Sequence, residues 1–359
     1  MKGSGCAALG CAGGLVVALA LVTGIATRVE LPPVLTGGRP GVHPVPALEP
    51  DVYHQVGALN QFHRDDEGER LRLTYGFIDY SGRARHVSCE IGKRDYERDV
   101  TSFGYFEDEL NGAVGEGLRE QFEREAERRG VRPYLRFEIH EGTGYRWQWR
   151  IPGGVEPAAA DQLVARLRAF DEWMEQDFPV KKEEILGRYL QERGLRLKGD
   201  KVEIDYQQAV ESDTGPLRDC FQALWQAGKG ESDRRLLGMF LSFFQELRYE
   251  VPPPIELGRH ILGFWPPSAV LVRGAGDCDS KSAAFCALWR HRPERAILIV
   301  IPEHALVGVE GKPRAGEAYV RLGNRYFVLC EVAGPGKIPP GGSSISGSFE
   351  YVMIEPAGG

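Results

Sequence analysis

The segment GDCDSKS, residues 276–282, places a cysteine between two acids, directly before a run with helical spacing. Three later residues share a helix face with this cysteine, at intervals of four, three and four: Ser282, Phe285 and Trp289. The pattern predicts a helix that begins at Cys278. Asp277 and Asp279 are expected to cap its first turn.

A cysteine at the start of a helix has a chemical consequence. The first backbone N–H groups have no partner inside the helix, and the positive end of the helix dipole lies beside them. Both favour a thiolate over a thiol, which makes Cys278 a candidate nucleophile. On this segment alone a second interpretation stays open, in which Cys278 is a small buried residue at a capped helix start.

Four candidate strands follow the helix, at residues 295–301, 303–309, 317–322 and 325–332. The first is a continuous apolar run, and Gly323-Asn324 supplies a two-residue hairpin turn between the last two. His304 lies in the second strand and Glu331 in the fourth, so neighbouring strands can bring the two side chains together. Taken singly, each residue also has an ordinary structural explanation: His304 as a histidine of the core, and Glu331 as an acid on the surface at the end of a strand.

Upstream, residues 233–249 place Leu and Phe side chains at the spacing of one buried helix face, and prolines at 252–254 end the pattern. The end of this helix reads FFQELRY, which looks like the F-x-Q-x-I-x-Y helix end of many bacterial transglutaminase-like proteins. Three further segments carry the same resemblance: GAGDCDSKSAAF, EHALVGV and YFVLCEVAGPG. Over roughly 201–333 the chain therefore resembles the transglutaminase-like superfamily, whose fold is related to the papain-like thiol enzymes.

The resemblance implies a role for each candidate residue. Cys278 would be the nucleophile, His304 the general base, and Glu331 the group that orients the imidazole. Gln245 would donate to the oxyanion beside the backbone N–H of Cys278. The chain departs from the pattern at Glu331, where members of the superfamily often carry aspartate.

The implied activity is that of a thiol enzyme on protein or peptide amide bonds, through an acyl-thioester. Water as the second substrate gives a peptidase or amidase, and a lysine amine gives a cross-linking enzyme. We favour hydrolysis, because the sequence has neither a recognisable amine channel nor the calcium loop D-x-D-x-D-G. The alternative from another class is a catalytically silent peptide-binding or assembly module of the cell envelope.

The N-terminus differs in composition from the rest of the chain. No charged residue occurs from Cys6 to Thr27, a length that spans a bilayer. We expect residues 1–28 to anchor a domain outside the cytoplasm, with a cleaved signal peptide or a lipid-modified cysteine as alternatives. Residues 29–50, rich in Pro and Gly, are expected to form a linker.

We expect residues 51–200 to form a mixed α+β domain, to which we assign no activity. Residues 201–359 are expected to form the transglutaminase-like domain. In the first region, residues 70–80 and 84–91 suggest a hairpin, and 107–129, 158–178 and 181–193 suggest helices. An aromatic stripe in a further strand pair is expected to pack in the core: Tyr145, Trp147 and Trp149. The expected fold class is α+β, with the nucleophile helix packed on an antiparallel sheet.

Composition narrows the possible partners. A chain of 359 residues with a formal net charge of −7 has no basic excess for nucleic acid. The resemblance implies a protein or peptide substrate, and the apolar N-terminal segment implies a membrane as the other partner. No CxxC pair occurs, and the sequence indicates no metal site and no cofactor. Five cysteines lie beyond the apolar segment, so at least one thiol is expected to be free unless two chains are joined.

Overall fold

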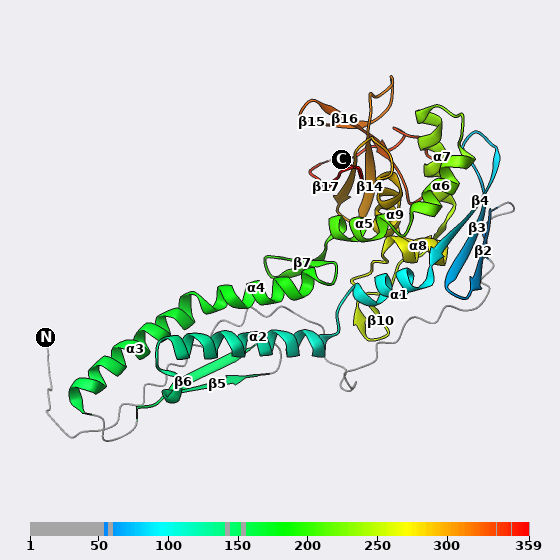
Figure 1. Cartoon of the computed structure of the whole chain (residues 1–359). Helices are drawn as coiled ribbons and strands as arrows, with labels where there is room; N and C mark the ends of the chain where they lie inside the picture. The colour runs from blue at the N-terminus through cyan, green and yellow to red at the C-terminus, as the bar shows by residue number, and fades with distance from the viewer. Residues whose placement is uncertain are drawn as a thin grey trace, which may run out of the picture. The chain divides into compact units, whose positions relative to one another are not determined.

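The structure is a computed structural model that describes residues 54–56, 60–140, 144–151, 156–334, 336–345 and 347–358. The described chain is mixed α+β, as the sequence predicted, and its sheets are antiparallel except for one short two-stranded pair (Figure 1). It divides into two compact units. Unit 1 contains the described residues of Asn111–Ile185, and unit 2 contains those of Pro33–Leu110 and Leu186–Gly359. The boundary predicted between residues 200 and 201 lies inside unit 2.

The predicted membrane segment, residues 1–28, and the predicted linker, residues 29–50, lie outside the described residues. Within the described part of the chain, no helix combines the length and the apolar character needed to cross a membrane. The anchor and the linker therefore stay predictions.

Unit 1 packs around aromatic side chains. Its elements, of which α2 and α4 continue into unit 2, are α2 (Glu107–Arg128), η1 (Arg132–Tyr134), β5 (Leu135–Ile139), β6 (Tyr145–Trp149), α3 (Pro157–Gln176) and α4 (Phe178–Gln191). Phe122 stacks on Phe137 with ring centroids 4.3 Å apart, and Phe170 meets Phe122 edge-on. In the predicted stripe, Trp147 is buried and its indole N–H donates to Asp171 at 3.0 Å. Core packing is therefore confirmed for Trp147.

Unit 2 opens with a four-stranded antiparallel sheet in the order β1-β2-β3-β4. Its strands are β1 (His54–Val56), β2 (Asn60–Glu67), β3 (Arg70–Ile78) and β4 (Ala84–Gly92). The predicted hairpin is confirmed, and its alternating face is buried: Leu71, Leu73, Tyr75 and Phe77. Helix α7 covers this face, because Phe243 contacts the rings of both Tyr75 and Phe77.

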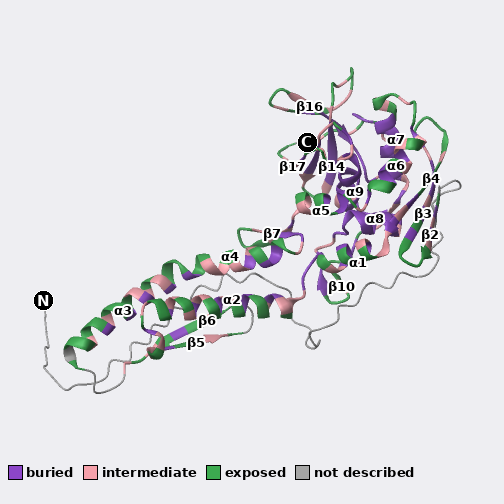
Figure 2. Cartoon of the chain, viewed as in Figure 1, coloured by how far each residue is buried: buried purple, intermediate pink, exposed green. Residues whose placement is uncertain are grey.

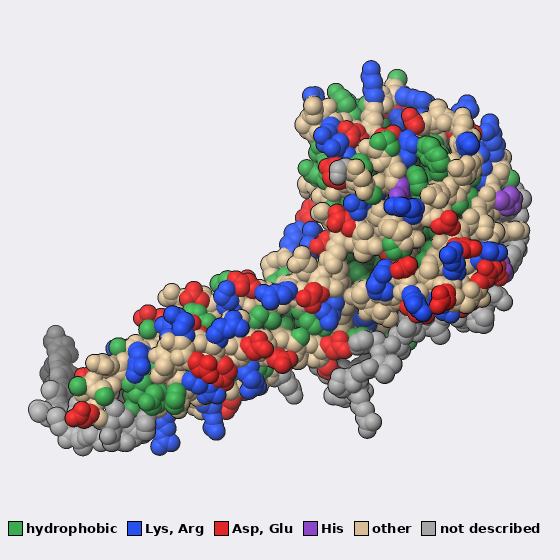
Figure 3. Space-filling view, viewed as in Figure 1, with side chains coloured by type: hydrophobic (Ala, Val, Ile, Leu, Met, Phe, Trp, Pro, Cys, Tyr) green, Lys and Arg blue, Asp and Glu red, His purple; other side chains and the backbone are tan. Residues whose placement is uncertain are grey.

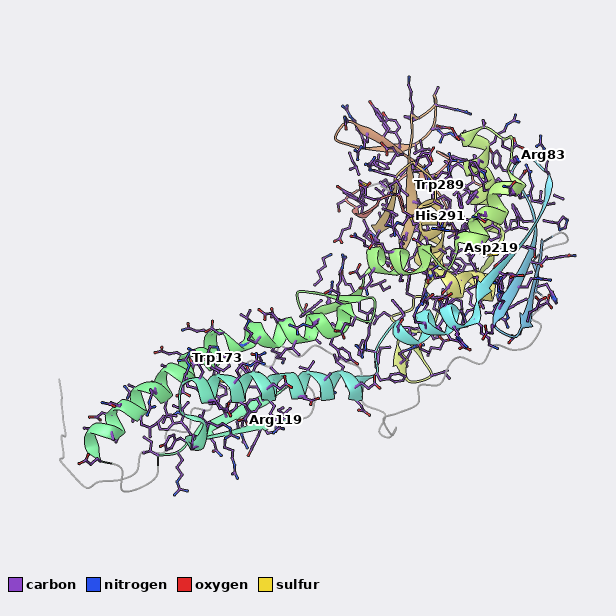
Figure 4. The ribbon with its side chains drawn as sticks, in the orientation of Figure 1. Arg83, Arg119, Trp173, Asp219, Trp289 and His291 are labelled. Atoms are coloured by element: carbon purple, nitrogen blue, oxygen red, sulfur yellow. A yellow bond between two sulfur atoms is a disulfide. The ribbon has the colours of Figure 1, made fainter. Side chains whose placement is uncertain are left out.

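A disulfide fastens this sheet to α6. It joins Cys89 of β4 to Cys220, with Cα atoms 4.9 Å apart. Beside it, the Asp219 carboxylate on α6 accepts from the Glu90 N–H at 2.7 Å (Figure 4). The sequence did not predict which cysteines pair. Among the described cysteines, Cys278, Cys286 and Cys330 are free, in agreement with the expectation of at least one free thiol.

The remaining helices of unit 2 precede or surround its C-terminal sheet. They are α1 (Lys93–Ser102), α5 (Tyr206–Thr214), α6 (Arg218–Ala227), α7 (Asp233–Glu246), α8 (Pro267–Arg273) and α9 (Cys278–Trp289). Short strand pairs lie between them: β7 (Leu195–Lys198) with β8 (Lys201–Ile204), β9 (Arg248–Tyr249) with β12 (Ala275–Gly276), and β10 (Ile255–Glu256) with β11 (Arg259–His260). The sequence analysis identified α7 and α9 but not α5, α6 or α8.

The helix predicted over 233–249 is shorter in the structure. It ends at Glu246, because Leu247 has extended backbone angles and residues 248–249 leave the helix to form β9. Strand β9 runs parallel to β12, with Arg248 opposite Ala275. The apolar pattern could not show this, since the partner of β9 lies nearly thirty residues further along the chain.

The C-terminal sheet has five antiparallel strands in the order β15-β16-β14-β13-β17. They are β13 (Ala296–Ile301), β14 (His304–Glu310), β15 (Tyr319–Leu322), β16 (Arg325–Cys330) and β17 (Glu350–Ile354). The four predicted strands are confirmed, and Gly323-Asn324 forms the turn between β15 and β16. Since β14 and β16 are neighbours, the strands that lead to His304 and Glu331 lie side by side.

Helix α9 is the centre of unit 2, with the five-stranded sheet on one side and α7 and α8 on the other. Every residue from Ser280 to Trp289 is buried, and Figure 2 shows α9 and β14 coloured as buried. A helix that is buried on all sides belongs to the core, although α9 also carries the polar residues Ser280, Lys281 and Ser282 there. The predicted helix start at Cys278 is confirmed. Trp289 and His291 lie at its other end (Figure 4).

The surface in view carries both signs of charge. Lys and Arg side chains are interspersed with Asp and Glu side chains over the face drawn in Figure 3. The chain also forms ion pairs at its surface, such as Arg70 with Glu90 and Lys198 with Glu350. Such pairs each contribute little to stability.

Candidate active site

Cys278 is the first residue of α9 and a free, half-buried thiol. The predicted cap is confirmed, because Asp277 and Asp279 both accept from the Ser280 N–H, at 3.3 and 2.8 Å. Strand β12 ends at Gly276 and pairs with β9, which fixes the backbone immediately before the helix. The side-chain hydrogen bonds to Ser280 after Cys278 and the strand pairing before it therefore fix the position of the helix start and of the thiol.

His304 begins β14 directly after a tight turn. Ile301, the last residue of β13, pairs directly with His304, the first residue of β14. The two turn residues between them are Pro302 and Glu303. Glu303 has a φ of 62°, in the left-handed region. Pro followed by a positive φ is the pattern of a type II turn, in which glycine is the usual second residue. A strained backbone position therefore lies next to His304.

Glu331 directly follows β16 and is largely buried, with 11% of its side chain exposed. One carboxylate oxygen, Oε1, accepts from the Ala333 N–H at 3.0 Å. The other, Oε2, accepts from Nε2 of His304 at 2.8 Å. Both oxygens have partners, so the acid is fixed in place while it orients the imidazole.

The imidazole of His304 lies between sulfur and carboxylate. A hydrogen bond with Cys278, and then one with Glu331, raises the pKa of His304 to about 10, although burial acts in the opposite direction. Because Nε2 is hydrogen-bonded to Glu331, the hydrogen bond with the Cys278 sulfur must be made by Nδ1, the other ring nitrogen. At neutral pH the ring is therefore protonated. The structure brings together all three of the residues that the sequence singled out for the triad.

Gln245 has a different role from the one predicted. Its amide nitrogen donates to the carbonyl oxygens of Glu331, at 2.7 Å, and Ile338, at 2.9 Å, and its amide oxygen accepts from the Ile338 N–H at 3.1 Å. Both amide hydrogens are used, so none is left for an oxyanion. Gln245 instead ties α7 to the chain segment that follows β16.

A pair of acids flanks the sulfur. Burial, followed by a hydrogen bond with Asp277, raises the pKa of Asp279 to about 7. The hydroxyl of Tyr206 donates to Oδ2 of Asp279 at 2.9 Å. Near neutrality Asp279 is therefore only partly charged, because burial and the neighbouring Asp277 disfavour its charged form. The pair therefore carries less negative charge next to Cys278 than its sequence indicates.

The sequence analysis missed a buried cation at this site. Lys281 lies one helical turn after Cys278, and its side chain is completely buried. Its ammonium donates to the carbonyl oxygens of Leu247, at 2.7 Å, and Ala333, at 3.0 Å. Both acceptors lie far from it in sequence, so no local pattern gave a sign of its burial.

Comparison with known proteins leaves the site to be interpreted on its own geometry. No protein-family model, no curated protein and no solved structure matches this chain. Among the described residues, no cluster of three or more His, Cys, Asp or Glu side chains is placed to hold a metal ion.

Proposed function

We propose that unit 2 is a thiol enzyme of the transglutaminase-like type, which cleaves or transfers amide bonds. The observation that carries this proposal is the position of His304, in contact with both Cys278 and Glu331. The fold supports it: the helix with the candidate nucleophile packs on an antiparallel sheet, and the histidine and acid come from its neighbouring strands β14 and β16. This is the arrangement that the sequence resemblance implies.

The proposed chemistry has two steps. The Cys278 thiolate attacks the amide carbonyl carbon, a C–S bond forms, and the C–N bond breaks as the His304 imidazolium gives its proton to the leaving amine. The product is an acyl-thioester and a neutral imidazole. Glu331 holds the ring so that one nitrogen faces the sulfur throughout. The backbone N–H of Cys278, which has no partner inside the helix, is the donor we assign to the oxyanion.

In the second step, neutral His304 takes a proton from the incoming nucleophile, which attacks the thioester and releases Cys278. Water gives the free acid, and a lysine amine gives an isopeptide cross-link. We propose hydrolysis as the main reaction, because the sequence carries no calcium loop of the D-x-D-x-D-G type and no recognisable amine channel.

We place the enzyme outside the cytoplasm, attached to a membrane through residues 1–28 or exported by them. The Cys89–Cys220 disulfide supports this location, because disulfides persist in oxidising compartments and are rare in the cytosol. Fractionation of cells that express the full chain tests the location. Recovery in the cytosolic fraction, with both cysteines reduced, would contradict it.

The proposed function is tested by the rate at which iodoacetamide alkylates the full chain at pH 7, followed for each cysteine by peptide mass spectrometry. We expect Cys278 to react faster than a model thiol, while the buried Cys286 and Cys330 stay unmodified. His304→Ala should lower the alkylation rate of Cys278 at least tenfold. If Cys278 reacts no faster than the model thiol, the site is silent, and the chain is better explained as a peptide-binding or assembly module.

A further inference from the structure

Lys281 is unusual because its ammonium is buried and, in the part of the chain that the structure describes, no carboxylate is bonded to it. The side chain is 0% exposed, and both of its hydrogen bonds go to backbone carbonyl oxygens. Lysine is almost never fully buried unless it is paired, since an ammonium loses its hydration on burial. The compensation must come from charges that lie near it without being bonded to it.

Those charges belong to the candidate active site. The groups that favour the charged form of Lys281 are Asp277 at the start of α9, Glu331 after β16, and Cys278 itself. On the β9 side the ammonium lies 5.8 Å from the ring centre of Tyr249.

The hydrogen bonds of Lys281 also reach the acid of the triad through the backbone. Its ammonium holds the carbonyl group of Ala333, and the N–H of the same residue donates to Oε1 of Glu331. The other oxygen of Glu331 then accepts from His304. Three hydrogen bonds, through Ala333 and Glu331, therefore connect the lysine to the imidazole. The lysine also fixes the end of α7 through Leu247.

We propose that Lys281 is a positioning residue of this active site, whose buried ammonium fixes the segment that carries Glu331 and balances the negative charge of Cys278 and Glu331. The inference rests on the proposed function. Burial lowers the pKa of Lys281 to about 8, and the three acidic groups counteract this effect. The ammonium is therefore mostly charged at neutral pH and loses its proton within the range in which a thiol enzyme works.

A substitution that keeps the shape of the side chain and removes its charge tests the proposal. We expect Lys281→Met, in the full chain, to slow alkylation of Cys278 at pH 7 by about tenfold, which corresponds to about 1.4 kcal/mol. The pH at which the rate is half-maximal should rise, because the thiolate has lost a neighbouring positive charge. Lys337→Met is the matched control: this lysine is partly exposed and pairs with Glu246, outside the site.

The outcomes separate the two proposals. Suppose that Cys278 is alkylated rapidly in the wild-type chain, and that a folded Lys281→Met chain has the same alkylation rate and pH profile. This result overturns the role of Lys281 but does not contradict the proposed enzyme. A Cys278 that is inert in the wild-type chain overturns both. A fall in melting temperature with no change in the pH profile shows a purely structural lysine and also counts against the inference.

A second measurement decides the matter if Lys281→Met does not fold. Coupling between two charges is reciprocal, so a thiolate that is stabilised by Lys281 must raise the pKa of the lysine by the same amount. In chains with ¹⁵N-labelled lysine, NMR should show an ammonium that titrates near pH 8 in the wild type. Cys278→Ser should lower that midpoint by about one unit, equivalent to about 1.4 kcal/mol. An unmoved midpoint would overturn the inference.

Discussion

Nε2 of His304 lies 2.8 Å from Oε2 of Glu331, while Oε1 of the same glutamate accepts from the Ala333 N–H at 3.0 Å. One carboxylate thus connects the imidazole to the backbone just beyond its own strand. Glutamate is one methylene longer than the aspartate common in the superfamily that the sequence resembles. The structure accommodates this extra length, so the glutamate is compatible with an orienting role.

Glu331→Gln should slow alkylation of Cys278 by about tenfold at pH 7. The amide keeps the shape of the side chain but removes the negative charge that helps to hold a proton on His304. The measurement is the alkylation rate of Cys278 by peptide mass spectrometry. Glu303→Gln, an exposed acid in the neighbouring turn, is the control and should leave the rate unchanged. An equal rate in Glu331→Gln would reduce the acid to a structural role.

The stabilising contribution of His304 should depend on pH. The pKa is raised in the folded chain, from an ordinary value near 6.5 to about 10. The contribution is therefore fully present below about pH 6.5 and is lost as the pH rises through 10. Urea unfolding of the wild type and of His304→Ala at pH 6, 8 and 10 measures it. Their difference in free energy of unfolding should shrink steadily with pH; a constant or growing difference would refute the assignment.

Cys278→Ala should leave stability within about 1 kcal/mol of the wild type, because this half-buried thiol contributes little packing. Cys286→Ala is the matched comparison on the same helix, where the side chain is completely buried. It should cost more, since it leaves a cavity in the core. Thermal unfolding of both variants gives the comparison. A larger loss for Cys278→Ala would identify that side chain as a packing residue.

Removing the Cys89–Cys220 disulfide should lower the free energy of unfolding by about 2–4 kcal/mol, because the cross-link restricts the unfolded chain. A double Cys→Ala variant at these positions, unfolded in urea without reductant, measures the effect. Dithiothreitol should destabilise the wild type and have no effect on the double variant. If reductant acts equally on both, the stabilising bond is elsewhere.

Gly238→Ala should destabilise unit 2 even though alanine is the better helix former. A methyl group at this position of α7 would overlap the ring of Tyr80, whose backbone N–H donates to Ser242 on the same helix. We expect a loss of about 1–3 kcal/mol. In a Tyr80→Ala background the same substitution should become neutral or stabilising. Equal effects in the two backgrounds would rule out the overlap.

The sequence predicted what depends on local periodicity. Spacings of about 3.6 or 2 residues indicate a single helix or strand. Such spacings predicted the helix that begins at Cys278, the strands near His304 and Glu331, and the buried face of β3. The three triad residues could be named because each begins or follows such an element. Their mutual contact depends on strand order, because β16 and not β15 lies beside β14. The hairpin at Gly323-Asn324 pairs β15 with β16 but does not decide which of the two is the neighbour of β14.

What the sequence could not predict depends on partners far along the chain. Gln245 resembled an oxyanion donor, but its amide is taken by backbone groups 86 and 93 residues later. The burial of Lys281 depends on acceptors that lie 34 residues before it and 52 after it. The loss of helix at Arg248 follows from pairing with Ala275. None of these has a local signature, because a hydrogen bond across the fold leaves the spacing of nearby residues unchanged.

The bond between Cys89 and Cys220 spans 131 positions of the chain, and unit 1 lies entirely within the closed loop. A protease that cuts once anywhere in residues 111–185 would therefore yield two fragments that stay covalently attached. They would migrate as one species on a non-reducing gel and separate only after reduction. The nucleophile and its partners all lie C-terminal to the loop on one uninterrupted segment, so a single nick in unit 1 would leave that segment whole and tethered to the sheet that β4 completes.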